Sequence, residues 1–573
     1  MENKENKRNY NVFFNTHTVS GIVISVGLFI CFFAGAFALF MDNINHWEAN
    51  DKNGTDYAII DYERVIKVVE NEGYNMQGRQ LGIFLREDNP SYIQVNSQPL
   101  EVKKDSTGTE KTQKPSEQDS IAKAGFFLKI DPESYEIKAK KFDPHTRQLG
   151  TFLYHLHYFN QIPTFGIYLA GLISIFFLFA IITGVIVHWR KIVANFFTFR
   201  LKASLKNLWT DAHTALGVIG LPFQFLYAVS GSLYGLTILI FIPAMLVLFD
   251  GDQDKMISYI APGFEKTEMS NKTLENRQNI NQLVERAVAQ YEDKTVTSVF
   301  LNLTNFNDAN AQLNINMNVE TEKAFYSNAN VKYSLASGEV VSEQKLGDNS
   351  YTDSVILTIH KLHFAQYGGY FIKAIYFLLA LITCFVILSG VMVWLEARNN
   401  KRYEKKKMFN TNVGAVYLGI CMGLFPAIAF FFGLTKVFPM DVPGRFGTMG
   451  SIFFTFWFAY ILYAYVIKDF HKINKHALFL GGILGIMIPF VNGAQTGLWP
   501  WESLTQGYVD TFFIDVSWFF LGLISLITAL SVQRLVSHKN KRKEKFQIKR
   551  LEKKEDISTE IPVMAVTDSS TAD

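Results

Sequence analysis

The sequence predicts a polytopic α-helical membrane protein with eight transmembrane helices and two outward α+β modules. Three observations lead to this prediction. The chain has 573 residues, of which 49% are hydrophobic and 15% aromatic. Apolar segments of about 20 residues, the length that a helix needs to cross a bilayer, occur eight times. A unit of helix, long polar segment and helix occurs twice, with a histidine at the border of every helix.

The eight apolar segments are expected to cross the lipid bilayer as helices. They cover residues 19–41, 161–188, 214–241, 370–395, 413–435, 449–467, 476–498 and 511–533. The first is too long for a signal peptide and has no convincing cleavage site after it, so we expect it to remain as an anchor.

Lys and Arg residues gather in every second connection, which sets the expected orientation. They lie before the first span, then after the second, fourth, sixth and eighth spans. By the positive-inside rule both termini and these loops are cytoplasmic, and the mixed-charge segments face outward. The formal net charge of +3 does not indicate a type of partner, because the Lys and Arg residues are concentrated in the connections expected on one side of the membrane. No nucleic-acid partner is expected.

These features divide the chain into seven expected segments, taken here in order. They are 1–41 (N-terminus and first span), 42–155 (first outward module), 156–248 (second span, basic cytoplasmic loop and third span), 249–361 (second outward module), 362–400 (fourth span), 401–535 (C-terminal four-helix membrane bundle) and 536–573 (a charged cytoplasmic tail, expected to be disordered).

Each outward module is predicted to contain one amphipathic helix followed by antiparallel strands. In the first module the helix is DYERVIKVVENEGYN and the strands are LGIFLRE, SYIQVNS, AGFFLKID and YEIKAKKFD, with a polar loop at 101–120. In the second the helix is NINQLVERAVAQYEDK and the strands are SVFLNLTN, AQLNINMNV and KAFYSNAN, followed by VKYSLASGEVVSEQ, a hairpin with ASGE as its turn.

The duplicated unit places histidines at related positions. His157 corresponds to His363 and Gly184 to Gly390, each pair 206 residues apart, and His17 corresponds to His213, 196 residues away. Imidazole is the commonest metal ligand and a usual axial ligand of haem iron. A pseudo-two-fold arrangement would place His17 opposite His213 at the cytoplasmic border and His157 opposite His363 at the outward border.

His188 is a fifth candidate cofactor-binding residue, because it could replace either member of the cytoplasmic pair. Other histidines are weaker candidates, because a single histidine at a membrane border is more often an interfacial residue or a helix cap. The remaining residues are His155 and His360, which neighbour the outward pair; His471 and His476, expected at the interface; and His46, His145 and His538, expected on the surface.

The three cysteines indicate what kind of haem could be held. Cys31, Cys384 and Cys421 all fall inside apolar spans, so no disulfide framework is expected in the outward modules. The chain also contains no CxxCH motif. Any haem would therefore be bound without covalent attachment, as haem b.

The order of these motifs resembles the PepSY-associated transmembrane family over roughly residues 10–400. The matching motifs are HTVSG from His17, LH at His157, TG at Gly184, HTALG from His213, LH at His363 and SG at Gly390. KIDPESYEI and YSLASGEVV are similar to the characteristic hairpin of the PepSY module. His188 stands where the second half has Trp394, so the two halves are not chemically equal.

The resemblance implies an inner-membrane ferric-chelate (siderophore) oxidoreductase of a bacterium, acting in iron uptake. It implies two b haems with His17, His157, His213 and His363 as axial ligands, a ferric siderophore or other ferric chelate as acceptor, and reduction on the outward side. No flavin or nicotinamide domain follows in the sequence, so the expected electron donor is external, a quinol or a cytoplasmic reductase.

Two alternatives remain open at this point: a transporter or permease for iron chelates, and a non-enzymatic envelope regulator that uses its PepSY modules. Duplicated membrane units also build carriers, but spans one to four show no mid-membrane charge and only Pro222 and Pro243 as interruptions. Asp515, near the outward border of the last span, is either a functional group or an interface cap.

One geometric difficulty concerns the distance between the two levels of histidines. His157 and His188 are 31 residues apart in the sequence, which is about 46 Å if the whole stretch is helical. A hydrocarbon core is about 30 Å thick. Either the ends of this stretch are not helical, or the haems tilt inward. The aromatic residues expected between the levels are Phe176, Phe177, Phe179, Tyr376 and Phe377.

Overall fold

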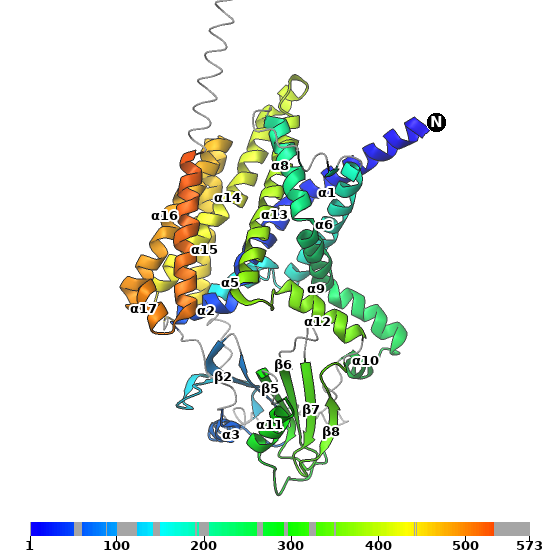
Figure 1. The fold of residues 1–573 in the computed structure, drawn as a ribbon, viewed down its shortest axis with the longest axis vertical. Helices are drawn as coiled ribbons and strands as arrows, with labels where there is room; N and C mark the ends of the chain where they lie inside the picture. The colour runs from blue at the N-terminus through cyan, green and yellow to red at the C-terminus, as the bar shows by residue number, and fades with distance from the viewer. Residues whose placement is uncertain are drawn as a thin grey trace, which may run out of the picture.

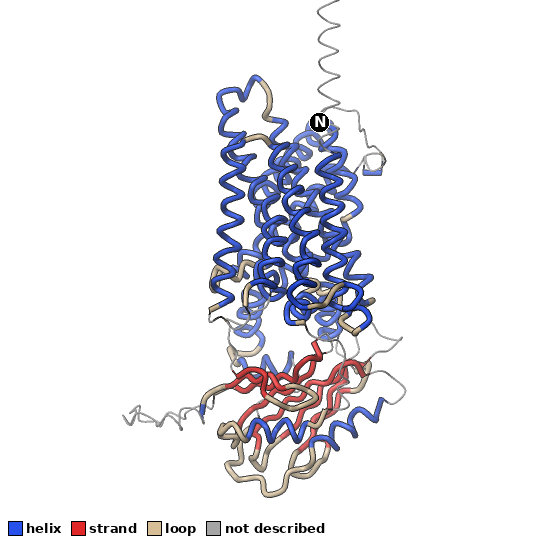
Figure 2. Tube along the Cα trace, turned by 90° about the vertical axis from the view of Figure 1, so that its left-hand side faces the viewer, coloured by secondary structure: helices blue, strands red, loops and turns tan. Residues whose placement is uncertain are grey.

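The computed structural model is a helical membrane bundle above an antiparallel sheet, stacked along the long axis (Figures 1 and 2). It describes residues 2–50, 60–86, 89–99, 123–140, 149–189, 192–193, 197, 205–260, 267–291, 296–319, 328–348, 351–439, 442 and 444–531. The expected loop 101–120, the tail 536–573, His145, His538 and most of the basic segment after His188 lie outside this range.

Seven helices in the described part of the chain are long and apolar enough to cross a membrane, or eight if one bent pair counts as a single span. The helices of the first 400 residues are α1 (Glu2–Ala38), α2 (Met41–Ala49), α3 (Tyr62–Glu70), α5 (Leu149–His157), α6 (Gly166–His188), α8 (Leu205–Ile219), α9 (Leu221–Leu248), α10 (Gln253–Ile260), α11 (Ile280–Val288) with the 3₁₀ turn Ala289–Tyr291, α12 (Tyr351–His363) and α13 (Gly369–Ala397).

The bent pair covers the third expected span. Residues 214–241 were expected to cross the membrane as one span, and the structure divides this segment between α8 and α9, which meet at an angle of 71°. The break falls at Gly220, and Pro222 follows it in the first turn of α9. Proline has no amide hydrogen to continue the preceding helix, and glycine costs a helix stability, so this pair of residues ends one helix and starts another.

The four spans of the duplicated unit, with α8 and α9 taken as one bent span, form a closed arrangement. α1 packs against α6 and α13, α6 also packs against α9, and α13 also packs against α8. Each half therefore contacts the other through α1 with α13 and through α6 with α9. Glycines allow the second contact, because a Cβ atom built on Gly171 would lie 2.8 Å from the backbone of Gly235.

The two segments that separate the membrane helices of each half build one continuous eight-stranded antiparallel sheet in the order β4-β3-β2-β1-β5-β6-β7-β8. The strands are β1 (Arg79–Arg86), β2 (Asn89–Ser97), β3 (Phe126–Ile130), β4 (Ile137–Lys140), β5 (Val296–Phe306), β6 (Gln312–Val319), β7 (Asn328–Ser334) and β8 (Val340–Gln344). The halves join where β1 pairs with β5, with Ile83 opposite Leu301. The hairpin expected around ASGE connects β7 to β8.

The sheet and its two helices share a single apolar core. Alternate residues such as Ile83, Val95 and Leu301 point to one face, where α3 and α11 cover them. Both helices begin with a side-chain cap, from Asp61 for α3 and from Asn279 for α11. The two caps and the apolar stripes fix both helices on the same face of the sheet.

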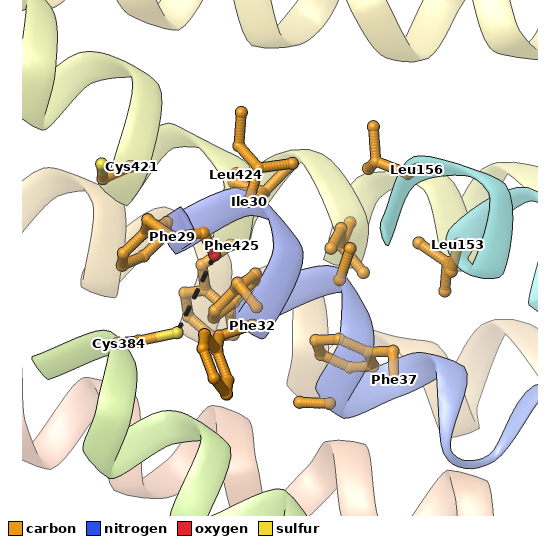
Figure 3. Packing of buried hydrophobic residues seen from close by; sticks show 14 of the residues in the cluster. Phe29, Ile30, Phe32, Phe37, Leu153, Leu156, Cys384, Cys421, Leu424 and Phe425 are labelled. Carbon is orange, nitrogen blue, oxygen red and sulfur yellow. Dashed lines mark hydrogen bonds between the residues drawn. The ribbon is translucent and has the colours of Figure 1, made fainter. Parts of the chain in front are cut away.

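The C-terminal bundle follows the duplicated unit. It comprises the 3₁₀ turn Lys401–Lys406, α14 (Lys407–Val437), α15 (Arg445–Ile467), α16 (Phe470–Thr496), the short α17 (Pro500–Thr505) and the last helix, Val509–Ser531. α14 packs against α15, α16 and α1. Figure 3 shows Phe29 and Phe32 of α1 close to Cys384, with Leu424 and Phe425 of α14 on another side of α1.

The cysteines and one histidine can be compared with the sequence expectations. Cys31, Cys384 and Cys421 are free and buried, as their positions in apolar spans predicted. The expectation of an exposed His46 was wrong: it is 1% exposed, and its Nδ1 lies 2.5 Å from the carboxylate of Asp510. The reason is that His46, on α2, lies beside Asp510 of the last helix of the C-terminal bundle.

Candidate functional site

His17 and His213 face each other at the end of the bundle that lies away from the sheet. Their ring centroids are 6.1 Å apart and the ring planes are inclined by 68°. His17 lies on α1 of the first half, and His213 lies on α8 of the second half. The structure thus brings together the pair that the duplication predicted.

Both rings of this pair lie against a backbone carbonyl, and Nδ1 of His213 lies in addition 3.3 Å from the hydroxyl of Ser389. Nδ1 of His17 lies 2.8 Å from the carbonyl oxygen of Ala180, and Nδ1 of His213 lies 2.9 Å from that of Val386. Each acceptor lies four residues before the repeated glycine, Gly184 or Gly390. A Cβ atom built on either glycine would stand 3.0 Å from Cε1 of the histidine, so the glycines leave room for the rings.

His157 and His363 form a second pair at the end of the bundle that faces the sheet. Their ring centroids are 6.3 Å apart and the planes are inclined by 57°. Each of these histidines is the last residue of a short helix, α5 or α12. Figure 1 shows both helices beside the sheet-facing end of the bundle, with the N-terminus of α1 at the other end.

The second pair is held by unequal partners. Nδ1 of His157 lies 2.6 Å from the carbonyl oxygen of Cys31, and its ring lies over Gly35, four residues later, where an added Cβ atom would approach Nδ1 to 2.6 Å. Nδ1 of His363 instead lies 2.7 Å from the hydroxyl oxygen of Ser230, which donates its own proton to the carbonyl of Leu226.

These partners determine which ring nitrogen carries the proton. A carbonyl oxygen only accepts hydrogen bonds, so the Nδ1 atoms of His17, His157 and His213 must each donate. Because the hydroxyl proton of Ser230 is already committed, Nδ1 of His363 donates as well. A neutral imidazole then has Nε2 as its lone-pair atom, and burial favours the neutral form. All four rings therefore present the nitrogen that ligates a metal.

The described residues contain no group of three or more His, Cys, Asp or Glu side chains that could hold a metal ion. The described residues therefore provide pairs of imidazoles, but no site in which protein side chains alone would complete the coordination of a metal ion. Two imidazoles that bind one iron from opposite sides have ring centres about 6 Å apart, from about 2 Å for each metal–nitrogen bond and about 1 Å from nitrogen to ring centre. The separations of 6.1 and 6.3 Å fit this requirement.

A cavity of about 280 Å³ opens between His157 and His363. Its walls are mainly apolar, and its few polar groups include tyrosines. The lining includes Phe32, Tyr154, Tyr158, Phe177, Phe223, Tyr227 and Tyr234. An apolar pocket with a few convergent polar groups is the usual form of a cofactor site, although this one is near the lower end of the usual size range.

The remaining histidines lie beside the two pairs or away from them. His188 ends α6, four residues beyond Gly184, and is half-buried. His360 Nδ1 lies 3.2 Å from the hydroxyl of Tyr234, and the ring of His155 contacts Tyr158. In the C-terminal bundle, His471 and His476 lie near the start of α16.

The two levels are closer than the sequence suggested. Residues 158–165 between α5 and α6 are not helical, and positive φ angles at Phe159 and Thr164 are incompatible with a continuous helix. Along α1, His17 and Cys31 are 14 residues apart, or about 21 Å. Of the aromatic residues expected between the levels, Phe177 and Tyr376 are buried, whereas Phe176 and Phe179 are exposed.

Sequence reasoning missed the partners that orient the rings. Three of these are backbone carbonyls, which carry no residue-type signal. The repeated glycines were noticed, and their spacing of four residues from the carbonyls is the signal that would have located the acceptors. Ser230 left no such trace, because its counterpart in the first half is Ala34.

Comparisons with known proteins agree with this architecture. The family described as the PepSY-associated TM region matches residues 14–397, which include both histidine pairs and both halves of the sheet. An uncharacterized protein from Pseudomonas aeruginosa is 22% identical over 352 residues, covering 59% of this chain and 83% of the relative. The match spans more than half of the chain and stops before the C-terminal bundle. The protein therefore belongs to the PepSY-associated TM region family.

Proposed function

We propose that this protein is a b-type haem-containing reductase of the bacterial inner membrane, which passes electrons outward to a ferric siderophore or another ferric chelate. The observation that carries the proposal is the pair of facing imidazoles at each of two levels of one bundle. The termini and the His17–His213 level would be cytoplasmic, and the sheet and the His157–His363 level would face outward.

The roles of the chain's own residues follow from their contacts. His17, His213, His157 and His363 would ligate two haems, and Ala180, Val386, Cys31 and Ser230 orient those four rings. Haem, when bound, supplies a one-electron change between ferric and ferrous iron. Phe32 contacts Phe177 and Phe223, and all three rings line the apolar cavity beside His157 and His363.

The electrons for the reduction come from an external donor. A ferric ion held by hard oxygen ligands takes up one electron and is then held far less tightly by the same ligands, so reduction releases the iron. A quinol would supply two electrons and release two protons, enough for two ferric ions. A cytoplasmic reductase would supply the same electrons at the level of His17 and His213.

The first test is spectroscopic. Purified full-length protein should give a pyridine haemochromogen of haem b, and its Soret band should shift on addition of dithionite. His157→Ala and His363→Ala should each remove the same fraction of the haem, and His17→Ala and His213→Ala should each remove the other fraction. A correctly folded but colourless preparation would overturn the proposal, and unequal losses within a pair would overturn the pairing.

The second test addresses the reaction. The protein is placed in liposomes with a reduced quinol in the membrane and a ferric trihydroxamate outside, together with a dye that reports ferrous iron. Colour should develop in proportion to haem content and should be absent with His157→Ala. Dye formation independent of haem would contradict the proposed electron path.

A chelate carrier is the second candidate, because the 71° break between α8 and α9 is a feature of transport proteins. The same liposomes distinguish the two functions. A carrier accumulates the intact radiolabelled chelate inside without forming ferrous iron, whereas a reductase forms ferrous iron and leaves the chelator outside.

A further inference from the structure

We propose that the C-terminal four-helix bundle fixes the position of His157, and that Glu48 is the positioning residue through which it acts. The inference gives a role to the part of the chain that lies beyond the family match. It rests on the proposed function only in treating His157 as a haem ligand. The mechanical link from Glu48 to α5 can be tested with or without haem.

Helix α5 has nine residues and ends with His157. An isolated helix of this length is unstable in water, so neighbouring structure must hold it in place. Any movement of α5 moves the ring of His157. The contacts that hold the first turn of α5 therefore determine where the ring lies.

Glu48 holds that first turn. One carboxylate oxygen of Glu48 accepts the backbone N–H of Leu149, the first residue of α5, at 2.5 Å. The other oxygen accepts from Arg445 of α15 at 2.7 Å, and Arg445 also donates to the carbonyl of Thr435 of α14 at 2.9 Å. A carboxylate at a helix N-terminus satisfies a free amide and interacts favourably with the helix dipole.

Two further contacts press α5 against α2 and the bundle. A Cβ atom added to Gly150 would lie 2.1 Å from the carbonyl oxygen of Met41, so the backbones of α5 and α2 touch there. The ring of Phe152 lies among aromatic rings of α14 and α15, with centroid distances of 4.7 Å to Phe431 and 5.2 Å to Phe453. Figure 3 shows Leu153 and Leu156 of α5 within the same apolar cluster as α1 and α14.

α2 is itself fixed to the C-terminal bundle by buried polar contacts. Asp510 lies 2.5 Å from His46 and accepts from the amide of Asn43 at 2.8 Å. Asp515 accepts from the indole N–H of Trp47 at 2.7 Å. Asp515, which the sequence left open between a functional group and a cap, thus joins α2 to the last helix. α2, through its residue Glu48, therefore connects the C-terminal bundle to α5.

The partner histidine has a different support. His363 ends α12, which packs on α9 of its own half, where Tyr227 donates to the backbone carbonyl of His363 at 2.7 Å. The bundle reaches this half at Tyr370 of α13, whose hydroxyl donates to Asp510, whereas α12 itself is held by α9. Loss of the Glu48 contact should therefore move His157 relative to His363, and should leave the His17–His213 pair unchanged.

The chain contains a matched control. Glu63 in the outward sheet domain also bridges an arginine and the first amide of a helix: it accepts from Arg277 at 2.7 Å and from the backbone N–H of Ile280, the first residue of α11, at 2.7 Å. Glu63→Ala removes the same interactions as Glu48→Ala, but in a domain with no contact to His157.

The experiment compares Glu48→Ala with Glu63→Ala in purified full-length protein. Hydrogen exchange of the α5 amides should accelerate at least about tenfold in Glu48→Ala and stay unchanged in Glu63→Ala, because a helix end that has lost its cap opens more often. The midpoint potential and low-temperature electron paramagnetic resonance signal of one haem should change in Glu48→Ala only.

A conservative variant covers the case in which Glu48→Ala fails to fold. Glu48→Gln keeps an acceptor for Leu149 but gives up the carboxylate that Arg445 needs, so it should produce a smaller change of the same kind. Unchanged α5 exchange and unchanged spectra would overturn the inference, as would equal changes at α5 and α12. Faster α5 exchange in a colourless protein would support the positioning role and count against the haem proposal.

Discussion

The two halves of the duplicated unit agree at one level of the bundle and differ at the other. At the His17–His213 level, both rings donate to a carbonyl oxygen, at 2.8 and 2.9 Å, and both lie against a glycine at the same distance. At the His157–His363 level, one ring donates to a carbonyl and the other to the hydroxyl of Ser230. Both rings of the His17–His213 level have a backbone acceptor, with Ser389 as a second contact of His213, whereas His363 at the other level depends on the side chain of Ser230 alone.

Single substitutions explain the differences between the halves. Gly220 and Pro222, which break α8 from α9, stand where the first half has Ile24 and Val26, and α1 runs through without a break. Backbone atoms are available at every position, so a contact made by the backbone survives sequence divergence. A contact made by Ser230 exists only in the half that has acquired the hydroxyl.

The largest effect is expected from substitutions beside the His17–His213 pair. Gly184→Val and Gly390→Val each place a branched side chain where even a Cβ atom would lie 3.0 Å from a histidine ring, and the ring must move. Each variant should lose about half of the haem, and the two losses should be the same. The pyridine haemochromogen assay measures this directly.

Gly433→Val is the control for these variants, because a Cβ atom at Gly433 meets nothing within 4 Å. It should retain full haem content. Markedly different losses in Gly184→Val and Gly390→Val would mean that the two halves are not equivalent even where their contacts agree.

A smaller effect is expected where the halves differ. Ser230→Ala removes the acceptor of His363 and leaves a buried N–H without a partner, and loss of such an outer contact typically weakens metal binding about 10- to 100-fold. Ser389→Ala is the matched variant at the His17–His213 level. It should have little effect, because His213 keeps the carbonyl of Val386. Competition with apomyoglobin measures the rate of haem loss, and equal rates for the two variants would contradict a special role for Ser230.

The features that could be predicted from the sequence are those that follow from the length of apolar segments and from the internal duplication. Apolar length located the spans, and duplication paired His17 with His213 and His157 with His363. The sequence was not sufficient where one contact outweighs a local pattern. His46 looked like a surface residue, and it is buried because Asp510, more than 460 residues later, packs beside it. The joining of the two modules into one sheet depends on the pairing of β1 with β5, for which neither strand carries a local signal.

The smallest expected effect compares the two hairpins of the sheet. Each contains a five-residue turn in which the backbone N–H of the last residue donates to the carbonyl of the first, from Tyr135 to Asp131 in the first half and from Gly338 to Ser334 in the second. The last residue of each turn has a positive φ, 63° at Tyr135 and 74° at Gly338. The first hairpin therefore contains a titratable group at a position where the second has a neutral one.

This difference predicts that only the first hairpin responds to acid. Burial alone would raise the pKa of Asp131, but Lys138 and the backbone amides of Glu133 and Ser134 donate to its carboxylate and lower the pKa to about 2. A carboxylate with a lowered pKa stabilises the fold above its unfolded pKa of about 3.9 and loses this contribution as the pH falls towards 2.

The loss should amount to about 1–2 kcal/mol at most, because Lys138 is half exposed and solvent screens the pair. Hydrogen exchange of β3 and β4, corrected for the intrinsic effect of pH, should therefore accelerate between pH 5 and pH 2.5, while exchange of β7 and β8 should not. Asp131→Asn should remove the pH dependence and make the first hairpin behave like the second. If both hairpins open together in acid, the sheet unfolds as one cooperative unit, and the continuity across β1 and β5 dominates over the chemistry of either half.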